Sequence, residues 1–319
     1  MNSLAALPTR PRRGLVIAGA TLTALASTAA WVAQRAQSAK SQSPPVGTFV
    51  DVDDTRVHYL ERGHGTPLVL LHGNTLRLED FVASDLIERL ARNYRVLAFD
   101  RPGFGYSERP RNRLWTAETQ AALLGQALLQ LGVERPIVLG HSWGTLVALE
   151  MALIPSVSVR KLVLISGYYF ATPRLDAVLA TPVAIPVLGD VMRYTVSALS
   201  ARLLLGRTVK AMFAPQAVPV NFIETLDREM LLRPVQIRAN AEDAAYMMPS
   251  ASALQRRYGE IRAPAAILAG AADKVVDPEK HARKLHVELE NSQLHVLPGV
   301  GHMLHHADPA KVVDTIGAD

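Results

Sequence analysis

The chain has 319 residues, of which 49% are hydrophobic, enough to bury the core of one large α/β domain with an insertion. Cysteine is absent, which excludes disulfides, thiolate metal sites and cysteine nucleophiles. The net charge of +5 comes from the first 40 residues, which hold five basic and no acidic side chains. The remaining 29 basic residues equal the 29 acidic ones, and a neutral body without a basic stripe argues against binding to nucleic acid.

Residues 14–33 form an uncharged stretch of about 30 Å at helical rise, which matches the hydrocarbon core of a bilayer. A signal anchor is the favoured interpretation. A cleaved export signal is the alternative, because the Arg12–Arg13 pair weakly resembles a twin-arginine signal, and a soluble helix is favoured least. The basic residues before this stretch place the body outside the cytoplasm. We expect residues 1–45 to be an anchor or export signal followed by a linker.

Short apolar runs then alternate with amphipathic stretches. Residues 48–54 and 56–63 predict an opening hairpin, and continuous apolar runs predict buried parallel strands within 67–73, 94–100, 136–142, 161–167, 265–270 and 293–299. Helical patterns cover 79–91, 117–131 and 144–153. This alternation predicts a doubly wound, mostly parallel eight-stranded sheet.

The alternation stops after Gly167 and resumes after residue 260. The intervening stretch has helical spacing, frequent prolines and no obvious strand. We therefore expect a core of residues 46–167 and 261–319, with residues 168–260 inserted as a helical cap.

A G-x-S-x-G motif, Gly140-His141-Ser142-Trp143-Gly144, lies between a predicted strand and a predicted helix. Glycines on both sides of such a sharp turn avoid a steric clash and leave the serine hydroxyl exposed at its tip. An isolated motif could equally place a helix N-cap serine in a glycine-rich loop. The flanking strand and helix favour Ser142 as a nucleophile.

A serine nucleophile needs an imidazole base and a carboxylate that orients it. Asp273 and His302 follow later strands in the order Ser, Asp, His, with Asp277 as a competing carboxylate. The nearby His305 and His306 raise the alternative of a metal site. We disfavour it because no matching carboxylate motif accompanies them, and we expect no metal and no cofactor.

The oxyanion formed on attack needs preorganised donors. The backbone N–H of Trp143 is one candidate, because it follows the nucleophile. The backbone N–H of Asn74 is the second, because it follows a buried strand in "LLHGNTL", although an ordinary turn is the alternative there.

These motifs, together with "FDRPGFGYS" and "GVGHMLHH", make the chain resemble the α/β-hydrolase superfamily over residues 46–319, in the branch with a single helical cap. The resemblance implies the fold and the triad but not the substrate, since the branch includes esterases, lipases, lactonases, carbon–carbon bond hydrolases, peptidases, epoxide hydrolases and dehalogenases. Its dehalogenases and epoxide hydrolases carry Asp at the nucleophile position, where this chain has Ser142.

The sequence thus predicts a serine hydrolase that cleaves a carboxylic ester or related acyl compound through an acyl-enzyme, with Ser142, His302 and Asp273 as the triad and an apolar small molecule as the acyl substrate. Carbon–carbon bond hydrolysis, lactone hydrolysis and acyl transfer or perhydrolysis by the same residues are alternatives. A non-catalytic binding protein on a hydrolase scaffold is an alternative of another class, which reactivity toward a fluorophosphonate would distinguish.

Overall fold

A computed structural model describes residues 12–220 and 222–318 of the chain. One eight-stranded sheet forms the centre of the body, in the order β1-β2-β4-β3-β5-β6-β7-β8. β1 and β2 form the expected hairpin and pair antiparallel, as do β2 and β4, whereas the other pairs are parallel. Every predicted strand is confirmed: β1 Thr48–Val52, β2 Thr55–Arg62, β3 Thr66–Leu71, β4 Tyr94–Phe99, β5 Ile137–His141, β6 Lys161–Ile165, β7 Ala265–Gly270 and β8 Ser292–Leu297.

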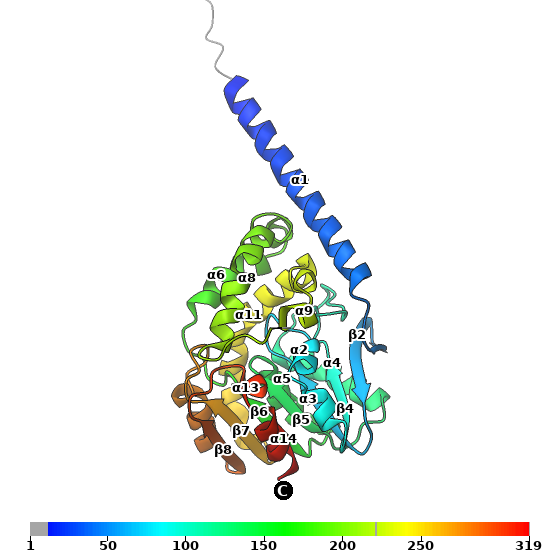
Figure 1. Cartoon of the computed structure of the whole chain (residues 1–319), viewed down its shortest axis with the longest axis vertical. Coiled ribbons are helices and arrows are strands. Elements are labelled where there is room, and N and C mark those ends of the chain that lie inside the picture. The colour runs from blue at the N-terminus through cyan, green and yellow to red at the C-terminus, as the bar shows by residue number, and fades with distance from the viewer. Residues whose placement is uncertain (1–11, 221, 319) are drawn as a thin grey trace, which may run out of the picture.

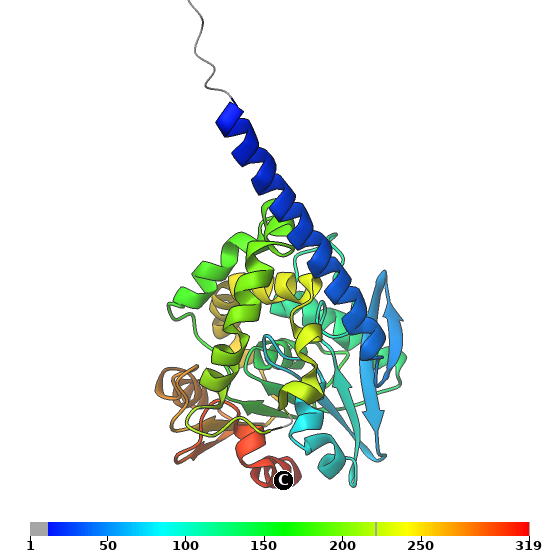
Figure 2. The same cartoon turned by 45° about the horizontal axis from the view of Figure 1, so that its top comes forward.

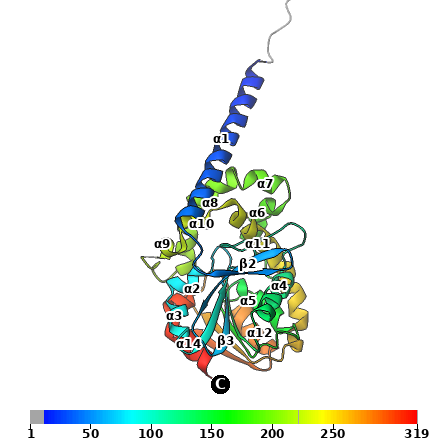
Figure 3. The same cartoon turned by 90° about the vertical axis from the view of Figure 1, so that its right-hand side faces the viewer.

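Helices cover both faces of the sheet (Figures 1 and 3). Between β6 and β7 the described chain contains helices and no strand. The helices are α1 Arg12–Gln42, α2 Glu79–Ala83, α3 Leu86–Leu90, α4 Ala117–Gln130, α5 Gly144–Ala152, α6 Leu175–Ala184, α7 Leu188–Met192, α8 Val196–Phe213, α9 Phe222–Leu226, α10 Arg228–Leu231, α11 Pro234–Leu254, the 3-10 helix η1 Gln255–Glu260, the π-helix η2 Glu279–Arg283, α12 Lys284–Glu288, α13 Leu304–Ala307 and α14 Pro309–Gly317.

The hydrophobic core consists of two main clusters, one on each face of the sheet. In β3, Val69 and Leu71 pack on the face covered by α4, α5 and α12, whereas Leu68 and Leu70 pack on the face covered by α2, α3 and α14. All residues of β5 and β7 are buried, as expected for parallel strands with helices on both sides. This packing fixes the ends of the parallel strands, where the candidate site lies.

One predicted helix differs from the structure. The pattern over residues 79–91 suggests a single helix, but the chain forms two short ones, α2 and α3. Asp85 between them has a φ of 59°, in the left-handed region, which interrupts the helical geometry. Apolar residues keep their helical spacing across the break, because both helices pack on the same face of the sheet.

Helix α1 leaves the body as a long rod (Figures 1 and 2). Its first half is exposed, with Leu15 and Leu22 open to solvent, whereas Val32 and Ala39 near its end are buried against the body. Its length and composition would allow it to cross a membrane, and an N-terminal signal sequence has the same character. Arg10, part of the predicted basic start, lies outside the described residues.

The start of α5 has no room for a side chain. A Cβ on Gly144 would lie 2.3 Å from the carbonyl oxygen of Leu71 in β3. We expect Gly144→Ala to destabilise the protein by about 1–3 kcal/mol through overpacking, as measured by chemical unfolding. Gly206→Ala is the control, because this helical glycine in α8 has open space around it. This substitution should leave the stability of the protein unchanged or raise it slightly. Equal effects of both substitutions would contradict the steric explanation.

Glu150 of α5 is buried, and its nearest cation is Arg257 at 3.7 Å. Burial, with a smaller contribution from Glu118, raises the pKa of Glu150 from 4.5 to about 7. Glu150 in the folded protein therefore keeps a proton that the unfolded chain releases, so the contribution of this group to stability is complete below about pH 4.5 and is lost as the pH rises through about 7.

We expect Glu150→Gln to remove this part of the pH dependence, on the order of 1–3 kcal/mol. The free energy of unfolding at a series of pH values would measure it. A substituted protein that keeps the full slope of the parent would show that Glu150 titrates normally.

Candidate active site

Ser142 lies at the tip of the turn between β5 and α5, as the motif predicts. Its φ is 51°, in the left-handed region that a non-glycine residue rarely adopts. A Cβ on Gly140 would lie 2.6 Å from the carbonyl oxygen of Gly144, so the turn closes too tightly for a side chain there. The strained turn presents the hydroxyl of Ser142 at the carboxyl edge of the sheet.

His302 lies directly beside this serine. Its Nε2 is 3.0 Å from the Oγ of Ser142, and its Nδ1 is 2.8 Å from Oδ2 of Asp273. The His302 and Asp273 side chains are almost fully buried. The structure thus brings together the three residues that the sequence nominates from three different loops. This geometry allows the ring to receive a proton from the hydroxyl while the carboxylate fixes its tautomer.

Asp273, rather than Asp277, faces the histidine. Oδ1 of Asp273 accepts hydrogen bonds from the backbone N–H groups of Val275 and Val276, at 2.8 and 2.9 Å, which orients its other oxygen toward the ring. Asp277 instead accepts from the backbone at the start of η2 and pairs with Lys280 on the surface. The two carboxylates therefore have different structural roles.

Glycines shape the loop that carries His302. Gly299 has a φ of 71°, and a Cβ on Gly301 would lie 2.1 Å from the carbonyl oxygen of Ala214, in the segment after α8. The loop therefore passes immediately under the inserted helices. Gln216 of the same segment accepts a hydrogen bond from the backbone N–H of Gly301 at 3.0 Å. The inserted helices and the histidine loop are held together at this point.

The two candidate oxyanion donors, Asn74 and Trp143, line one cavity together with Ser142. A Cβ on Gly73 would lie only 3.1 Å from the Cβ of Ser142, so the loop after β3 passes directly beside the nucleophile turn. This close approach brings the two candidate loops together. The roles of their backbone N–H groups stay predictions.

Arg101, at the end of β4, holds the loop after β3. Its Nε donates to the carbonyl oxygen of His72 at 2.8 Å, and its Nη2 donates to that of Gly73 at 3.2 Å. The ring of His72 accepts from the backbone N–H of Arg101 at 3.0 Å, and burial lowers the pKa of His72 to about 4, so this ring is neutral and structural. Arg101 was not nominated as a site residue, although it lies within the family-like "FDRPGFGYS" stretch.

Helix α11 adds two supports that the sequence does not reveal. Asp243 pairs with Arg101 at 2.6 Å and with Arg109 at 3.0 Å, and all three side chains are fully buried. Asn240, one turn earlier, accepts a hydrogen bond from the backbone N–H of Thr75 at 2.8 Å through its Oδ1. No local pattern marks either residue, because their partners lie far away in the chain.

Behind the site lies a buried group of Asp80, His305 and His306. The Nε2 atoms of His305 and His306 are 2.9 and 2.8 Å from the two oxygens of Asp80. Burial alone would raise the pKa of Asp80, but the two histidines outweigh it and lower this pKa well below its usual range. Burial lowers the pKa of His141, whose Nδ1 is 3.9 Å from Asp80.

Among the residues that the structure describes, Asp80, His305 and His306 have the spacing of metal ligands, because their ligand atoms lie within 4.8 Å of one another. Hydrogen bonds between the rings and the carboxylate already account for this spacing. Both histidines lie in the short helix α13. Sequence reasoning weighed the histidines but missed Asp80, which lies 225 positions before His305.

The cavity above Ser142 has a volume of about 160 Å³. Helices α8 and α11 form much of its roof, through Thr208, Met212, Ala244 and Met247. Apart from the site residues and Arg174, most of its lining is apolar. The full lining is Asn74, Thr75, His141, Ser142, Trp143, Tyr168, Arg174, Thr208, Met212, Ala244, Met247, Val275, Val276 and His302.

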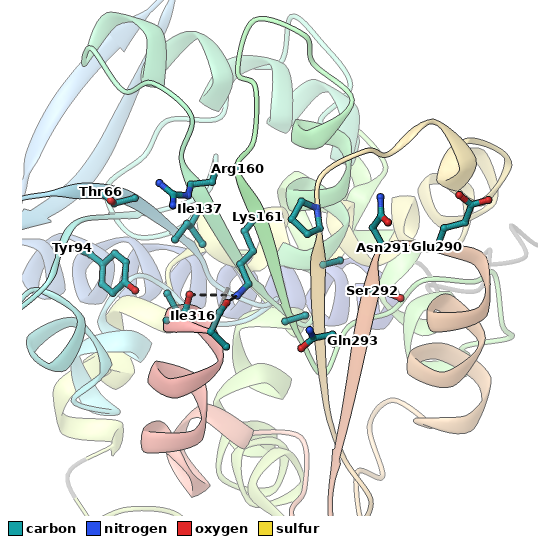
Figure 4. A pocket seen from close by; sticks show the side chains of 15 residues that line it. Thr66, Tyr94, Ile137, Arg160, Lys161, Glu290, Asn291, Ser292, Gln293 and Ile316 are labelled. Carbon is teal, nitrogen blue, oxygen red and sulfur yellow. Dashed lines mark hydrogen bonds between the residues drawn. The ribbon is translucent and has the colours of Figure 1, made fainter.

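A larger hollow of about 620 Å³ lies at the opposite edge of the sheet, where the parallel strands begin (Figure 4). Lys161, Asn291 and Ile316 are among its lining residues, and Nζ of Lys161 donates to the carbonyl oxygen of Thr315 at 2.9 Å. Ligands of open α/β sheets bind at the carboxyl ends of the strands. The smaller cavity beside Ser142 is therefore the better candidate for chemistry.

Comparison with known proteins extends this description. The family model for the alpha/beta hydrolase fold matches residues 66–309. Haloalkane dehalogenase 2 of Mycobacterium tuberculosis is 31% identical over 127 residues, 40% of this chain and 44% of that protein, so the chain matches less than half of its length. The 2-hydroxy-6-oxo-2,4-heptadienoate hydrolase of Pseudomonas putida is 28% identical over 253 residues, 78% of this chain and 86% of that protein.

Among solved structures, an esterase from Exiguobacterium antarcticum superposes with a TM-score of 0.71 at 22% identity, over 85% of this chain and 98% of that chain. A structural match at such low sequence identity supports a shared fold and nothing more. The match of the family model, together with the sheet order and the strand–turn–helix at Ser142, establishes that the chain belongs to the α/β-hydrolase family.

Proposed function

We propose that the protein is a serine hydrolase that cleaves a carboxylic ester through an acyl-enzyme. The observation that carries this proposal is the continuous chain of contacts from Ser142 Oγ through His302 to Asp273, at 3.0 and 2.8 Å. Such a chain activates a hydroxyl that would otherwise be a weak nucleophile.

In the first step, Oγ of Ser142 attacks the carbonyl carbon while His302 Nε2 takes the hydroxyl proton. The negative charge that develops on the carbonyl oxygen is held by the backbone N–H groups of Asn74 and Trp143. His302 then gives the proton to the departing alcohol, which leaves the acyl group on Ser142. A water molecule, deprotonated by the same ring, attacks the acyl carbon and releases the acid and the free serine.

The lining of the cavity supports an apolar acyl group as substrate. Met212, Met247, Val275 and Val276 surround the space above Ser142, and methionine side chains adapt to varied apolar shapes. A volume of about 160 Å³ accommodates a small acyl group.

Carbon–carbon bond hydrolysis is the second candidate. It is favoured by the similarity to the Pseudomonas putida 2-hydroxy-6-oxo-2,4-heptadienoate hydrolase over most of both chains. Haloalkane dehalogenation is not proposed, because the residue expected to be Asp in that reaction is Ser142 here. Parallel assays with p-nitrophenyl esters and a vinylogous diketone would separate the two candidates.

We also propose a division of the chain into an N-terminal anchor and linker (1–45), a core (46–167 and 261–319) and a helical cap (168–260). The anchor crosses the membrane through residues 14–33 and holds the catalytic body outside the cytoplasm. The exposure of the first half of α1 supports this assignment over a helix packed within a soluble body.

Ser142→Ala should lower ester turnover by at least about 10³-fold, because no other group replaces the attacking oxygen. Initial rates with p-nitrophenyl esters, together with the far-ultraviolet circular dichroism of the folded protein, would test this. Ser158→Ala is a matched control: this exposed serine also has a positive φ, of 49°, but lies outside the site. Undiminished turnover by the Ser142 variant would end the proposal.

Asn240→Ala should lower kcat by about 10- to 100-fold with little change in KM, since the loop that carries Asn74 loses a support and the oxyanion donors shift. Steady-state kinetics on the same esters would measure both constants. Asn291→Ala, in the hollow at the opposite edge of the sheet, is the control and should leave both unchanged. Wild-type kinetics in the Asn240 variant would refute the assigned support.

A further inference from the structure

Exposed apolar side chains gather on helices α6 to α8. Leu175, Leu179, Val187 and Leu203 are 72–81% exposed. Soluble proteins rarely leave such a concentration of large apolar side chains open to water without an interacting partner. The full set, called the cap face below, is Leu175, Val178, Leu179, Ile185, Val187, Leu188, Val191, Val196, Leu199, Leu203 and Leu204.

Helices α6, α7 and α8, which carry the cap face, lie at the end of the body from which α1 extends (Figures 1 and 3). Val32 of α1 packs in one cluster with Val183 of α6 and Ala198 of α8. The guanidinium of Arg202 on α8 lies 5.0 Å from the ring centre of Trp31. The helix proposed to cross the membrane is therefore in direct contact with the helices that carry the cap face.

An ion-pair network fixes this contact. Glu229 of α10 binds Arg202 through two hydrogen bonds, at 2.5 and 2.7 Å, and pairs with Arg35 of α1 at 3.1 Å. These pairs lower the pKa of Glu229 to about 2, so the carboxylate is charged at neutral pH. The position of α1 on the cap helices is thus specified by charge and by apolar packing.

This contact determines where the bilayer surface lies. If residues 14–33 fill the hydrocarbon core, Trp31 lies at its boundary, where tryptophan is enriched in membrane proteins. Arg202, which covers the Trp31 ring, then lies among the lipid headgroups. Leu199 and Leu203, three positions before and one position after Arg202 on α8, are both exposed.

One face of α8 changes from apolar to basic along the length of the helix. Val196, Leu199, Leu203, Arg207 and Lys210 recur at spacings of three and four residues, so they share one face of the helix. All five are exposed. The apolar first half of this face suits acyl chains, and its basic second half suits anionic headgroups.

We propose that the cap face docks onto the outer surface of the same bilayer that α1 crosses, with its apolar side chains in the boundary between headgroups and acyl chains. The occupant is lipid rather than a second copy of the chain, because the face is continuous with the membrane-crossing helix and ends in basic residues. This inference rests on the proposed membrane attachment and is independent of the reaction at Ser142.

The absence of native cysteine permits single-site labelling. Leu179→Cys on α6 and Leu203→Cys on α8 would each carry an NBD fluorophore on the full-length protein, reconstituted into vesicles of phosphatidylcholine and phosphatidylglycerol. Val287→Cys on α12, where the native valine is 83% exposed, is the matched control away from the cap face. Leu22→Cys in α1 reports on the anchor itself.

We expect the probes at positions 179 and 203 to shift to shorter emission wavelengths and to be quenched by lipids brominated on their acyl chains, while the probe at 287 is unaffected. Cap probes that behave like the one at 287 would overturn the proposal. Quenching at position 22 alone would then show that the anchor holds and only the docking fails, whereas no quenching at 22 would remove the anchor as well. Cap probes that are shielded but insensitive to brominated lipid, with energy transfer between differently labelled copies, would overturn the proposal in favour of a second copy.

Discussion

The sharp turn at Ser142 is the constraint on which the site depends. The chain leaves a fully buried strand and starts a buried helix within three residues, with the serine held at a positive φ. Neither flanking glycine can carry a side chain, because Gly140 lies against the backbone of the next helix and Gly144 against that of β3. The close contact of Gly144 with β3 also brings the loop after β3, which carries Asn74, beside the serine. One packing arrangement therefore positions both the nucleophile turn and the loop with the candidate oxyanion donor.

A second layer of buried charge connects this arrangement to the inserted helices. Arg101 contacts the carbonyl groups of the loop after β3 and also Asp243 of α11, while the indole Nε1 of Trp143 donates to the carbonyl oxygen of Asp243 at 2.9 Å. Buried charges are expensive unless they are paired and hydrogen-bonded, and breaking such a pair costs far more than its formation gains. The inserted helices therefore take part in building the site in addition to covering it. Helix α8 extends this connection outward, since Thr208 and Met212 line the cavity while Leu203 belongs to the cap face.

The sequence allowed the strands, the strand–turn–helix at Ser142 and the order of Asp273 and His302 to be predicted, because each depends on local pattern. The break between α2 and α3 was missed, because apolar residues keep their helical spacing on both sides of Asp85. The backbone itself leaves the helical conformation at this residue. Asp80, Asn240 and Asp243 were missed for another reason: each acts on a partner more than 100 residues away. Likewise, apolar residues on α6 and α8 look like core residues in a sequence, and only the fold reveals that they point outward.

The most direct test of the central claim is the site of reaction with a fluorophosphonate, located by mass spectrometry of the digested, full-length protein. The account predicts one covalent phosphonate on the peptide that contains Ser142, formed by the folded protein and lost after denaturation, because the reactivity comes from the neighbouring His302 rather than from serine itself. A folded protein that stays unmodified, or that is modified at another serine, would contradict it.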